Sequence, residues 1–271
     1  MPYVYLDSVR IYFEEEGEGQ PLVLIHGASQ DTLSWYDNIR HLAKSYKVYA
    51  LDLPGHGKSA LINRRPTTIT QEFAHYVALF LAEKDIQNAV LVGHSLGAGV
   101  SIMAALAAPD RTKGVVSVCG GAAFRGPTGV TYQPDMLQNT EINPTDWLET
   151  IFHSVLGRTT PVDRQREMAF DATRCSPYVA FSDLLTYSSL NLHEHIHLIR
   201  KPLFYIVGED DWSTTPEMAR ATSEQLGSMG IATEFHELKG IGHIPHWEQP
   251  EAFNAVLDGV LNRILTAPEK Q

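Results

Sequence analysis

The chain contains short segments in which apolar residues follow one another almost without interruption. Five of them are rich in β-branched residues and cover residues 21–25, 46–51, 89–92, 114–118 and 203–207. Such runs are typical of strands that are buried on both faces, as they are in a parallel sheet. Between them, apolar residues recur with helical spacing over residues 33–43, 69–83, 96–108, 216–229 and 250–265. Alternating strands and helices predict an α/β fold with a mostly parallel central sheet.

Two regions depart from this alternation. Residues 4–7 and 10–14 alternate partly around a tight link, which predicts an antiparallel hairpin at an edge of the sheet. Residues 124–194 contain no predicted strand. A stretch rich in Gly, Pro and Thr is followed there by three short helical patterns, over residues 147–156, 162–170 and 178–190. We therefore expect one domain over residues 1–271, with an inserted segment over 124–194 between two sheet strands.

The composition limits the class of protein. Hydrophobic residues make up 44% and charged residues 20% of the chain, as in ordinary globular domains. The net charge of −11 repels a phosphate backbone and disfavours nucleic-acid binding. The sequence begins without a signal-like segment, and no apolar run approaches the roughly 18 residues of a membrane span. We expect a cytoplasmic protein with no nucleic-acid or membrane partner, and the oligomeric state stays open.

The strand over residues 89–92 runs directly into the sequence Gly-His-Ser-Leu-Gly at residues 93–97, and an Ala-rich helical pattern follows. This is a Gly-x-Ser-x-Gly motif in its strand, turn and helix context. Glycines two residues on either side of Ser95 are needed because a Cβ there would collide with the neighbouring strand and helix. We interpret Ser95 as a nucleophile exposed at the carboxyl end of the sheet, rather than as a helix-capping serine.

A serine nucleophile needs a base, and histidine is the usual one because its pKa lies near neutrality. His243 lies in a Gly-rich loop after the alternating stretch 233–238. His246 is its rival, which we interpret as a surface or helix-start histidine. A carboxylate must also orient the base. The sequence Glu-Asp-Asp at residues 209–211 follows the strand over 203–207 and supplies three candidates at the same sheet edge.

Further motifs accompany these residues: His26-Gly27 after the first parallel strand, Asp-Leu-Pro-Gly-His-Gly-Lys-Ser at residues 52–59, and Glu248-Gln249-Pro250 behind Gly242-His243. With them, nearly the whole chain resembles the α/β-hydrolase fold superfamily. The chain order of serine, acid and histidine is also the order in that family.

The resemblance implies roles for particular residues. The acid usually lies three residues after the glycine in Gly-x-x-Asp, which favours Asp211 over Asp210. The backbone N–H groups of Leu96 and Ala28 would hold the oxyanion, with Ser29 as a possible second donor on its loop. In relatives, the inserted segment forms a helical cap over the active site. The family's serine hydrolases need no cofactor, and we predict neither a cofactor nor a metal.

The leading hypothesis is a serine hydrolase that cleaves a small carboxylic ester or lactone through an acyl-enzyme, with a small acyl compound as its partner. The resemblance also admits hydrolases of C–C bonds in ring-cleavage products, thioesterases and perhydrolases, which use the same triad. A ligand sensor with slow or no turnover is a hypothesis from another class. Fold and triad do not distinguish these possibilities.

Two weaker signals point elsewhere. Histidines 193, 195 and 197 alternate, and on a strand they would share one face, as a metal site requires. No cysteine or second histidine cluster is near in sequence, so we interpret them as solvated linker histidines. Gly57-Lys58-Ser59 is similar to the end of a phosphate-binding loop, but Asp52 stands where that motif needs a glycine.

Overall fold

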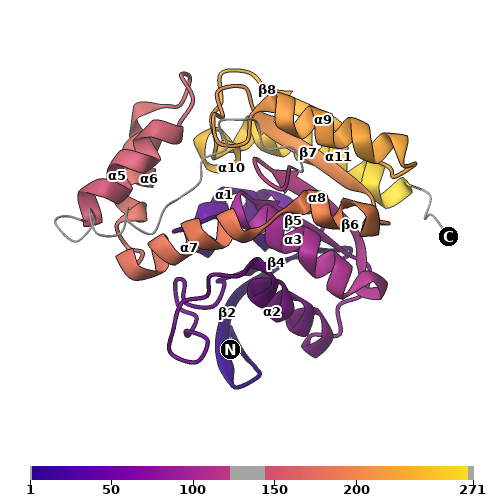
Figure 1. The fold of residues 1–271 in the computed structure, drawn as a ribbon, viewed down its shortest axis with the longest axis horizontal. Coiled ribbons are helices and arrows are strands. Elements are labelled where there is room, and N and C mark those ends of the chain that lie inside the picture. Colours follow the sequence, from indigo (N-terminus) through magenta and orange to yellow (C-terminus); the bar gives the residue numbers. More distant parts are fainter. Residues whose placement is uncertain (1, 123–143, 268–271) are drawn as a thin grey trace.

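The computed structural model describes residues 2–122 and 144–267 (Figure 1). Within them, eight strands form one sheet in the order β1-β2-β4-β3-β5-β6-β7-β8. The strands are β1 (Tyr3–Leu6), β2 (Val9–Glu16), β3 (Pro21–Ile25), β4 (Lys47–Leu51), β5 (Ala89–His94), β6 (Thr112–Val118), β7 (Leu203–Gly208) and β8 (Phe235–Leu238). β1 and β2 pair antiparallel, β2 pairs antiparallel with β4, and the remaining pairs are parallel. The predicted α/β fold and its hairpin at the sheet edge are confirmed.

The strand register brings the ends of distant segments together. Ile25 pairs with Gly93, His94 with Val118, and Val118 with Ile206. Gly208 in turn pairs with Leu238 at the end of β8. The carboxyl ends of five parallel strands therefore meet at one edge of the sheet, which is where open α/β sheets bind ligands.

The central strands are almost completely buried, which explains their nearly continuous apolar sequences. Every residue of β5 and β7 is buried. Helices cover both faces of the sheet, with α2 and α3 on one face and α1 and α11 on the other (Figure 1). The helices and 3₁₀ turns outside the inserted segment are η1 (Thr32–Trp35), α1 (Tyr36–Leu42), α2 (Thr70–Glu83), α3 (Leu96–Ala107), η2 (Pro109–Arg111), α9 (Pro216–Ser228), α10 (Pro245–Glu248) and α11 (Pro250–Thr266).

Helices also occupy the described part of the segment between β6 and β7. They are α5 (Pro144–Val155), α6 (Val162–Ala172), α7 (Pro177–Ser189), α8 (Leu192–His195) and the 3₁₀ turn η3 (Ile196–Leu198). The three predicted helical patterns correspond to α5, α6 and α7. A small apolar cluster that includes Leu148, Phe152, Met168 and Trp247 joins α5 and α6 to α10. The predicted Gly-, Pro- and Thr-rich stretch over residues 124–143 lies outside the described residues.

The metal-site alternative for the three alternating histidines required a strand, and that strand is not present in the described residues 193–197. His193 and His195 lie in α8, and His197 lies in η3. In a helical segment, residues two apart point in different directions, so these three rings do not share one face as they would on a strand.

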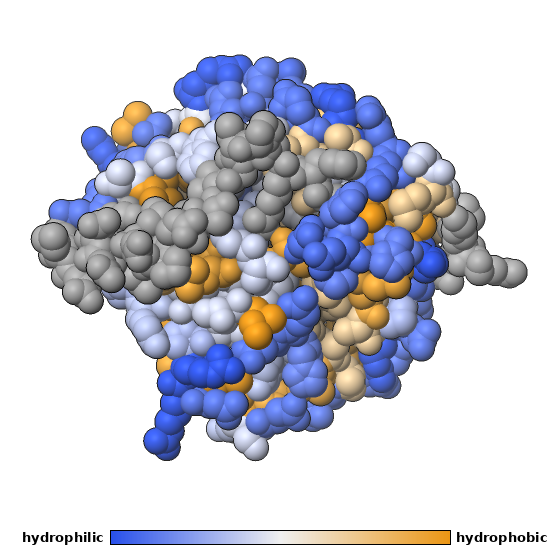
Figure 2. Space-filling view, in the orientation of Figure 1, coloured by the Kyte–Doolittle hydropathy of each residue, from blue (hydrophilic) through white to orange (hydrophobic). Residues whose placement is uncertain are grey.

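Most side chains on the face shown in Figure 2 are hydrophilic, and apolar residues appear there in small patches. The helices in the described part of the chain are all too short or too polar to cross a membrane.

Candidate active site

Ser95 lies on a sharp turn between β5 and α3. Its φ is positive, at 51°, with ψ of −114°, which is unusual for a residue with a side chain. A Cβ on Gly93 would lie 2.1 Å from the Gly97 carbonyl oxygen, and one on Gly97 would lie 2.4 Å from the carbonyl oxygens of Ile25 and His26. The amide of Ser95 donates to the Val118 carbonyl at 2.8 Å, which fixes the turn against β6. The steric requirement expected from the motif is present at both glycines.

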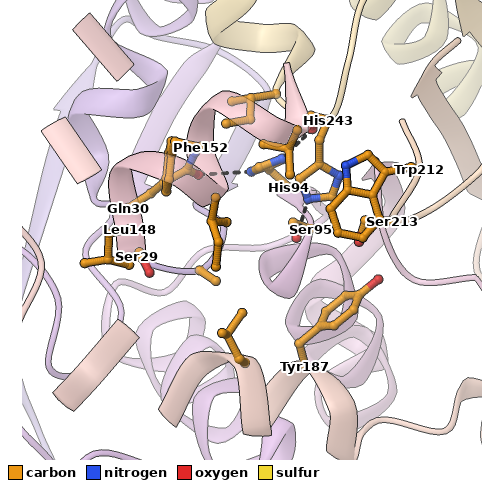
Figure 3. Close-up of a pocket in the computed structure, with 15 residues that line it drawn as sticks. Ser29, Gln30, His94, Ser95, Leu148, Phe152, Tyr187, Trp212, Ser213 and His243 are labelled. Atoms are coloured by element: carbon orange, nitrogen blue, oxygen red, sulfur yellow. Dashed lines mark hydrogen bonds between the residues drawn. The ribbon is translucent and has the colours of Figure 1, made fainter. Parts of the chain in front are cut away.

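His243 lies between the side chains of Ser95 and Asp211. Figure 3 shows its ring beside Ser95. Its Nε2 is 2.9 Å from the Ser95 hydroxyl, and its Nδ1 is 2.9 Å from Asp211 Oδ2. Because a carboxylate only accepts, Nδ1 carries the proton and Nε2 is the free acceptor facing the hydroxyl. The other oxygen of Asp211 accepts the amides of Ser213 and Thr214 at 2.8 and 3.1 Å. This arrangement allows His243 to remove the serine proton.

The environment of His243 favours its protonated form. Burial by itself would lower the pKa of His243, but the charge and hydrogen bond of Asp211 raise it, so the pKa lies above its ordinary value. Asp211 is 3% exposed and His243 is 8% exposed, so little water screens this attraction. A buried carboxylate that stabilises the imidazolium is what proton transfer from Ser95 requires.

The three acidic candidates after β7 are in different positions. Asp211 faces His243, whereas Asp210 accepts the backbone N–H of Arg158 at 2.8 Å and also binds its guanidinium. Glu209 accepts the Gly240 amide at 2.9 Å. Of the three, Asp211 alone contacts the histidine.

His246 is not a surface residue, which corrects one of the two interpretations that the sequence left open. It lies in the first turn of α10, but it is completely buried and its ring stacks on Trp35 with centroids 3.9 Å apart. Burial, and then the nearby His243, hold the pKa of His246 well below its usual range. Both ring nitrogens lack a hydrogen-bond partner among the described residues. The apolar body of the ring therefore packs in the core.

The two backbone amides that we predicted as oxyanion donors belong to Ala28 and Leu96, which lie close to Ser95. Ala28 follows β3 and lines the same pocket as Ser95, while Leu96 is the first residue of α3, where amides have no partner within the helix. The Ser29 amide, which we considered as a second donor, donates instead to Asp183 Oδ2 at 2.8 Å. Ala28 is therefore the candidate donor on that loop.

Glu248 organises the loop that carries His243. This carboxylate is 1% exposed and accepts the amides of Gly242 at 3.0 Å and Ile244 at 2.8 Å, the residues on either side of the histidine. It also accepts the Gly157 amide, from the segment after α5, at 2.8 Å. Sequence reasoning noted Glu248 as part of a motif but gave it no role. In the sequence, only its position shortly after His243 indicated a role for Glu248.

His94 links three loops, which sequence reasoning also missed. Its Nε2 donates to the His243 carbonyl at 2.8 Å, and its Nδ1 lies 3.0 Å from Gln30 Oε1 in the loop after β3. Gln30 Oε1 in turn accepts the Gly27 amide at 2.9 Å. Burial, followed by the charges of His246 and His243, holds the pKa of His94 well below its ordinary value. The His94 side chain thus holds the loop of His243 against the turn that carries Ser95, and its ring lies beside Gln30 of the loop after β3.

A pocket opens beside Ser95 between the sheet edge and helices α5 and α7 (Figure 3). Its lining is mostly apolar and includes Leu148, Ile151, Phe152, Val155, Leu184, Tyr187, Trp212 and Ile244. The described residues of the lining include no Lys, Arg, Asp or Glu. The pocket therefore suits an uncharged, apolar group.

Within residues 2–122 and 144–267, Cys119 is the one side chain that forms a candidate metal-ligating group with Asp211 and His243. Its sulfur and the ligand atoms of Asp211 and His243 lie within 4.8 Å of one another. Burial raises the pKa of the Cys119 thiol well above its ordinary value, which disfavours the thiolate that binds metals. Asp211 and His243 are already bonded to each other. This chemistry does not favour a metal ion at these residues.

Several known proteins are similar in sequence to this chain. The chain is 41% identical over 114 residues to the dihydrolipoyllysine-residue acetyltransferase component of the acetoin cleaving system of Cupriavidus necator, a match that covers 42% of this chain and 30% of that protein. It is 25% identical to the human (lyso)-N-acylphosphatidylethanolamine lipase over 92% of this chain and 81% of the lipase.

A thermophilic esterase from Thermogutta terrifontis with malate bound has a similar fold, with a TM-score of 0.84 and 21% identity over 95% of both chains. A model of the alpha/beta hydrolase family matches residues 22–256. This match covers most of the chain, and the order of the eight strands agrees with it. The chain therefore belongs to the alpha/beta hydrolase family and is a hydrolase.

Proposed function

We propose that this hydrolase cleaves a small carboxylic ester or lactone with Ser95 as nucleophile, His243 as base and Asp211 as the orienting acid. The observation that carries the proposal is the continuous chain of hydrogen bonds from Ser95 through His243 to Asp211, at 2.9 Å for each step. Its support is geometric, because each atom has the partner that its role requires.

In the proposed mechanism, His243 Nε2 takes the proton of Ser95 as the serine oxygen attacks the substrate carbonyl carbon. The amides of Ala28 and Leu96 stabilise the negative charge that develops on the carbonyl oxygen. His243 then gives its proton to the leaving alcohol, and an acyl-enzyme remains on Ser95. Water, activated by His243, attacks the acyl carbon and releases the acid. No cofactor enters any step.

The pocket supports an uncharged substrate. An ester or lactone bears no charge, and its hydrocarbon part can be buried against Leu148, Phe152 and the other apolar lining residues. A charged group would lose its hydration without gaining an ion partner among the described lining residues.

We also propose that residues 124–194 act as a cap within a single domain over residues 1–271. Helix α5 supplies Leu148, Ile151 and Phe152 to the pocket, and α7 supplies Leu184 and Tyr187. Both helices belong to the segment between β6 and β7, so residues that follow one strand close the pocket formed at the sheet edge.

Turnover of p-nitrophenyl esters tests the proposal. We expect the wild-type protein to hydrolyse neutral esters and to discriminate against an acyl group that ends in a carboxylate, because the pocket lining is apolar. Ser95→Ala should lower kcat by roughly 10⁴-fold or more, since the nucleophile is removed. The proposal is wrong if the wild type hydrolyses no acyl substrate, a result that would favour a ligand sensor, or if Ser95→Ala retains full activity.

A further inference from the structure

A buried carboxylate joins the proposed cap to the proposed oxyanion loop. Asp183 lies on α7 and is 1% exposed. Its Oδ2 accepts the backbone N–H of Ser29 at 2.8 Å and a hydrogen bond from His56 Nε2 at 2.8 Å. Ser29 directly follows Ala28, whose amide is a proposed oxyanion donor. One oxygen atom from the inserted segment thus determines where the amide next to that donor lies.

The backbone of Ser29 depends on this contact. Its φ is +61°, in the left-handed region that residues with a side chain seldom adopt. Such a conformation is strained and persists only when the surroundings hold it. The hydrogen bond to Asp183 is an interaction that holds the Ser29 amide in this orientation, so its loss would allow the loop to relax.

His56 completes the partner set of Asp183. Its Nδ1 lies 3.2 Å from the Pro54 carbonyl and its Nε2 lies against Asp183, so both ring nitrogens face acceptors and suit the imidazolium form. Burial would lower the pKa of His56, but the charge and hydrogen bond of Asp183 raise it above its ordinary value. Asp183 is therefore held in place by a buried hydrogen-bond partner.

A second histidine connects this pair to the same loop. His26 accepts the Leu53 amide at Nε2, at 3.0 Å, so its Nδ1 carries the proton and donates to the Gly27 carbonyl at 2.8 Å. The rings of His26 and His56 lie 4.8 Å apart. The oxyanion loop is thus held on one side of Ala28 by His26 and on the other by Asp183.

We propose that Asp183 is a positioning residue for catalysis: by holding the Ser29 amide from the inserted segment, it sets the direction of the Ala28 amide toward the developing oxyanion. This inference rests on the proposed function. It assigns to the segment between β6 and β7 a part in transition-state stabilisation, in addition to covering the pocket. A displacement of about 1 Å at a positioned group can cost on the order of 100-fold in rate.

Another contact between the same two regions serves as a comparison. Arg174, between α6 and α7, binds Asp31 Oδ2 at 2.9 Å, two residues after Ser29. The arginine side chain is 41% exposed, so water and salt screen this pair and its contribution is small. We therefore assign the positioning to the buried contact.

The test compares purified variants in the ester assay. Asp183→Ala should lower kcat by roughly 10- to 100-fold with KM within about 3-fold, because the pocket that binds the acyl group is unchanged. Asp183→Asn, whose amide oxygen can still accept the Ser29 N–H, should retain more of kcat than Asp183→Ala. Ser182→Ala is the matched control on α7, because in the described part of the chain the Ser182 hydroxyl bonds within its own helix, to the Tyr178 carbonyl. Its kinetics should equal those of the wild type.

A second variant separates positioning from folding. Asp183→Ala removes the partner that raises the pKa of His56 and leaves a buried imidazole nitrogen without its acceptor, which can prevent folding. The double substitution His56→Phe with Asp183→Leu removes both members of the pair, and apolar replacement of a buried pair often costs little stability. It still leaves Ser29 without its acceptor, so kcat should fall as in Asp183→Ala.

A trifluoromethyl ketone gives a readout that a merely structural role would not change. It forms a hemiketal with the serine, and its oxyanion occupies the same site as that of the transition state. Its affinity should fall by the same factor as kcat/KM in the double variant. If the folded double variant has wild-type kcat and wild-type affinity for the ketone, the inference is wrong. If the wild type itself hydrolyses no ester, the proposed function is wrong instead.

Discussion

Asp211 has two separate sets of partners, one for each oxygen. Oδ1 accepts two backbone amides of the following turn, and Oδ2 faces His243. Because the amides can only donate, Oδ1 must stay an acceptor, and the carboxylate cannot rotate without losing both bonds. The position of His243 relative to Ser95 therefore depends on the Asp211 side chain, which the backbone amides of the following turn hold in place.

This arrangement predicts the effect of Asp211→Asn. The amides of Ser213 and Thr214 would select the asparagine oxygen, so the NH₂ group would face His243 Nδ1. The histidine would then carry its proton on Nε2 and could not accept one from Ser95. We expect kcat to fall by roughly 10⁴-fold in the ester assay. Asp210→Asn is the matched control, because Asp210 binds Arg158, and kcat should stay within about 3-fold. A larger loss in Asp210→Asn than in Asp211→Asn would overturn the choice of acid.

The pH profile of the same variant gives an independent check. His243 must be neutral to act as a base, so activity is lost as the pH falls through its pKa. Because Asp211 raises this pKa, the acidic limb of kcat/KM in the wild type should lie above the ordinary histidine value of about 6.5. The residual activity of Asp211→Asn should have its acidic limb at lower pH.

Among single residues, the sequence predicts the candidate site residues that belong to recognisable motifs. Ser95 and His243 could be found from their glycine-flanked positions, and Asp211 from its distance to Gly208. Asp183 could not, because it lies on an inserted helix without any motif, and its partners are 127 and 154 positions away. The burial of His246 also depends on contacts between distant segments, since its ring packs against Trp35.

The turn from β5 into α3 is the element that presents Ser95, and its glycines are a steric necessity. Gly97→Ala would place a methyl group 2.4 Å from two backbone carbonyl oxygens of the β3 end, which cannot move without shifting the sheet. We expect a loss of roughly 1–3 kcal/mol or more in the free energy of unfolding, measured by urea denaturation. The displaced Ser95 should also reduce kcat.

Gly227→Ala is the matched control for this substitution. Gly227 lies in α9, and a Cβ there would have its nearest neighbour, Thr233 Cγ2, at an ordinary 3.7 Å. Alanine is the better helix former, so this variant should gain about 0.5–1 kcal/mol. Equal urea midpoints for Gly97→Ala and the wild type would contradict the steric account of the turn.

Elements buried on both faces are the ones that the sequence predicts best. The limits of β3 follow from its apolar run, because burial leaves little choice of residue, whereas β5 begins where predicted and continues two residues further, to His94. The stretch over 33–43, predicted as one helix, is instead η1 followed by α1, since Asp31 caps a short 3₁₀ turn first. The strand alternative for residues 193–197 failed because alternation of polar residues alone, without apolar partners, does not specify a strand.

On the scale of the molecule, the register of the sheet brings together groups that are far apart in the sequence. The loops after β3, β5, β7 and β8 carry Ala28, Ser95, Asp211 and His243, respectively, and β5 lies next to β3 in the sheet. In a parallel sheet the carboxyl ends of the strands lie at one edge, so the loops that follow them are predicted to lie close together. The candidate site could therefore be proposed from the sequence. The apolar character of the described pocket lining, in a chain with net charge −11, could not be predicted, because much of its apolar part comes from helices α5 and α7 of the inserted segment.

The central claim is that Ser95 is an activated nucleophile, and covalent labelling tests it most directly. A fluorophosphonate reacts with a serine whose hydroxyl is deprotonated by a neighbouring base. We predict that the wild-type protein takes up one phosphonyl group per chain and that peptide mass spectrometry places it on Ser95. Ser95→Ala should remain unlabelled, and Asp211→Asn should label far more slowly than Asp210→Asn. An unlabelled wild-type protein, or an adduct on another residue, would contradict the account.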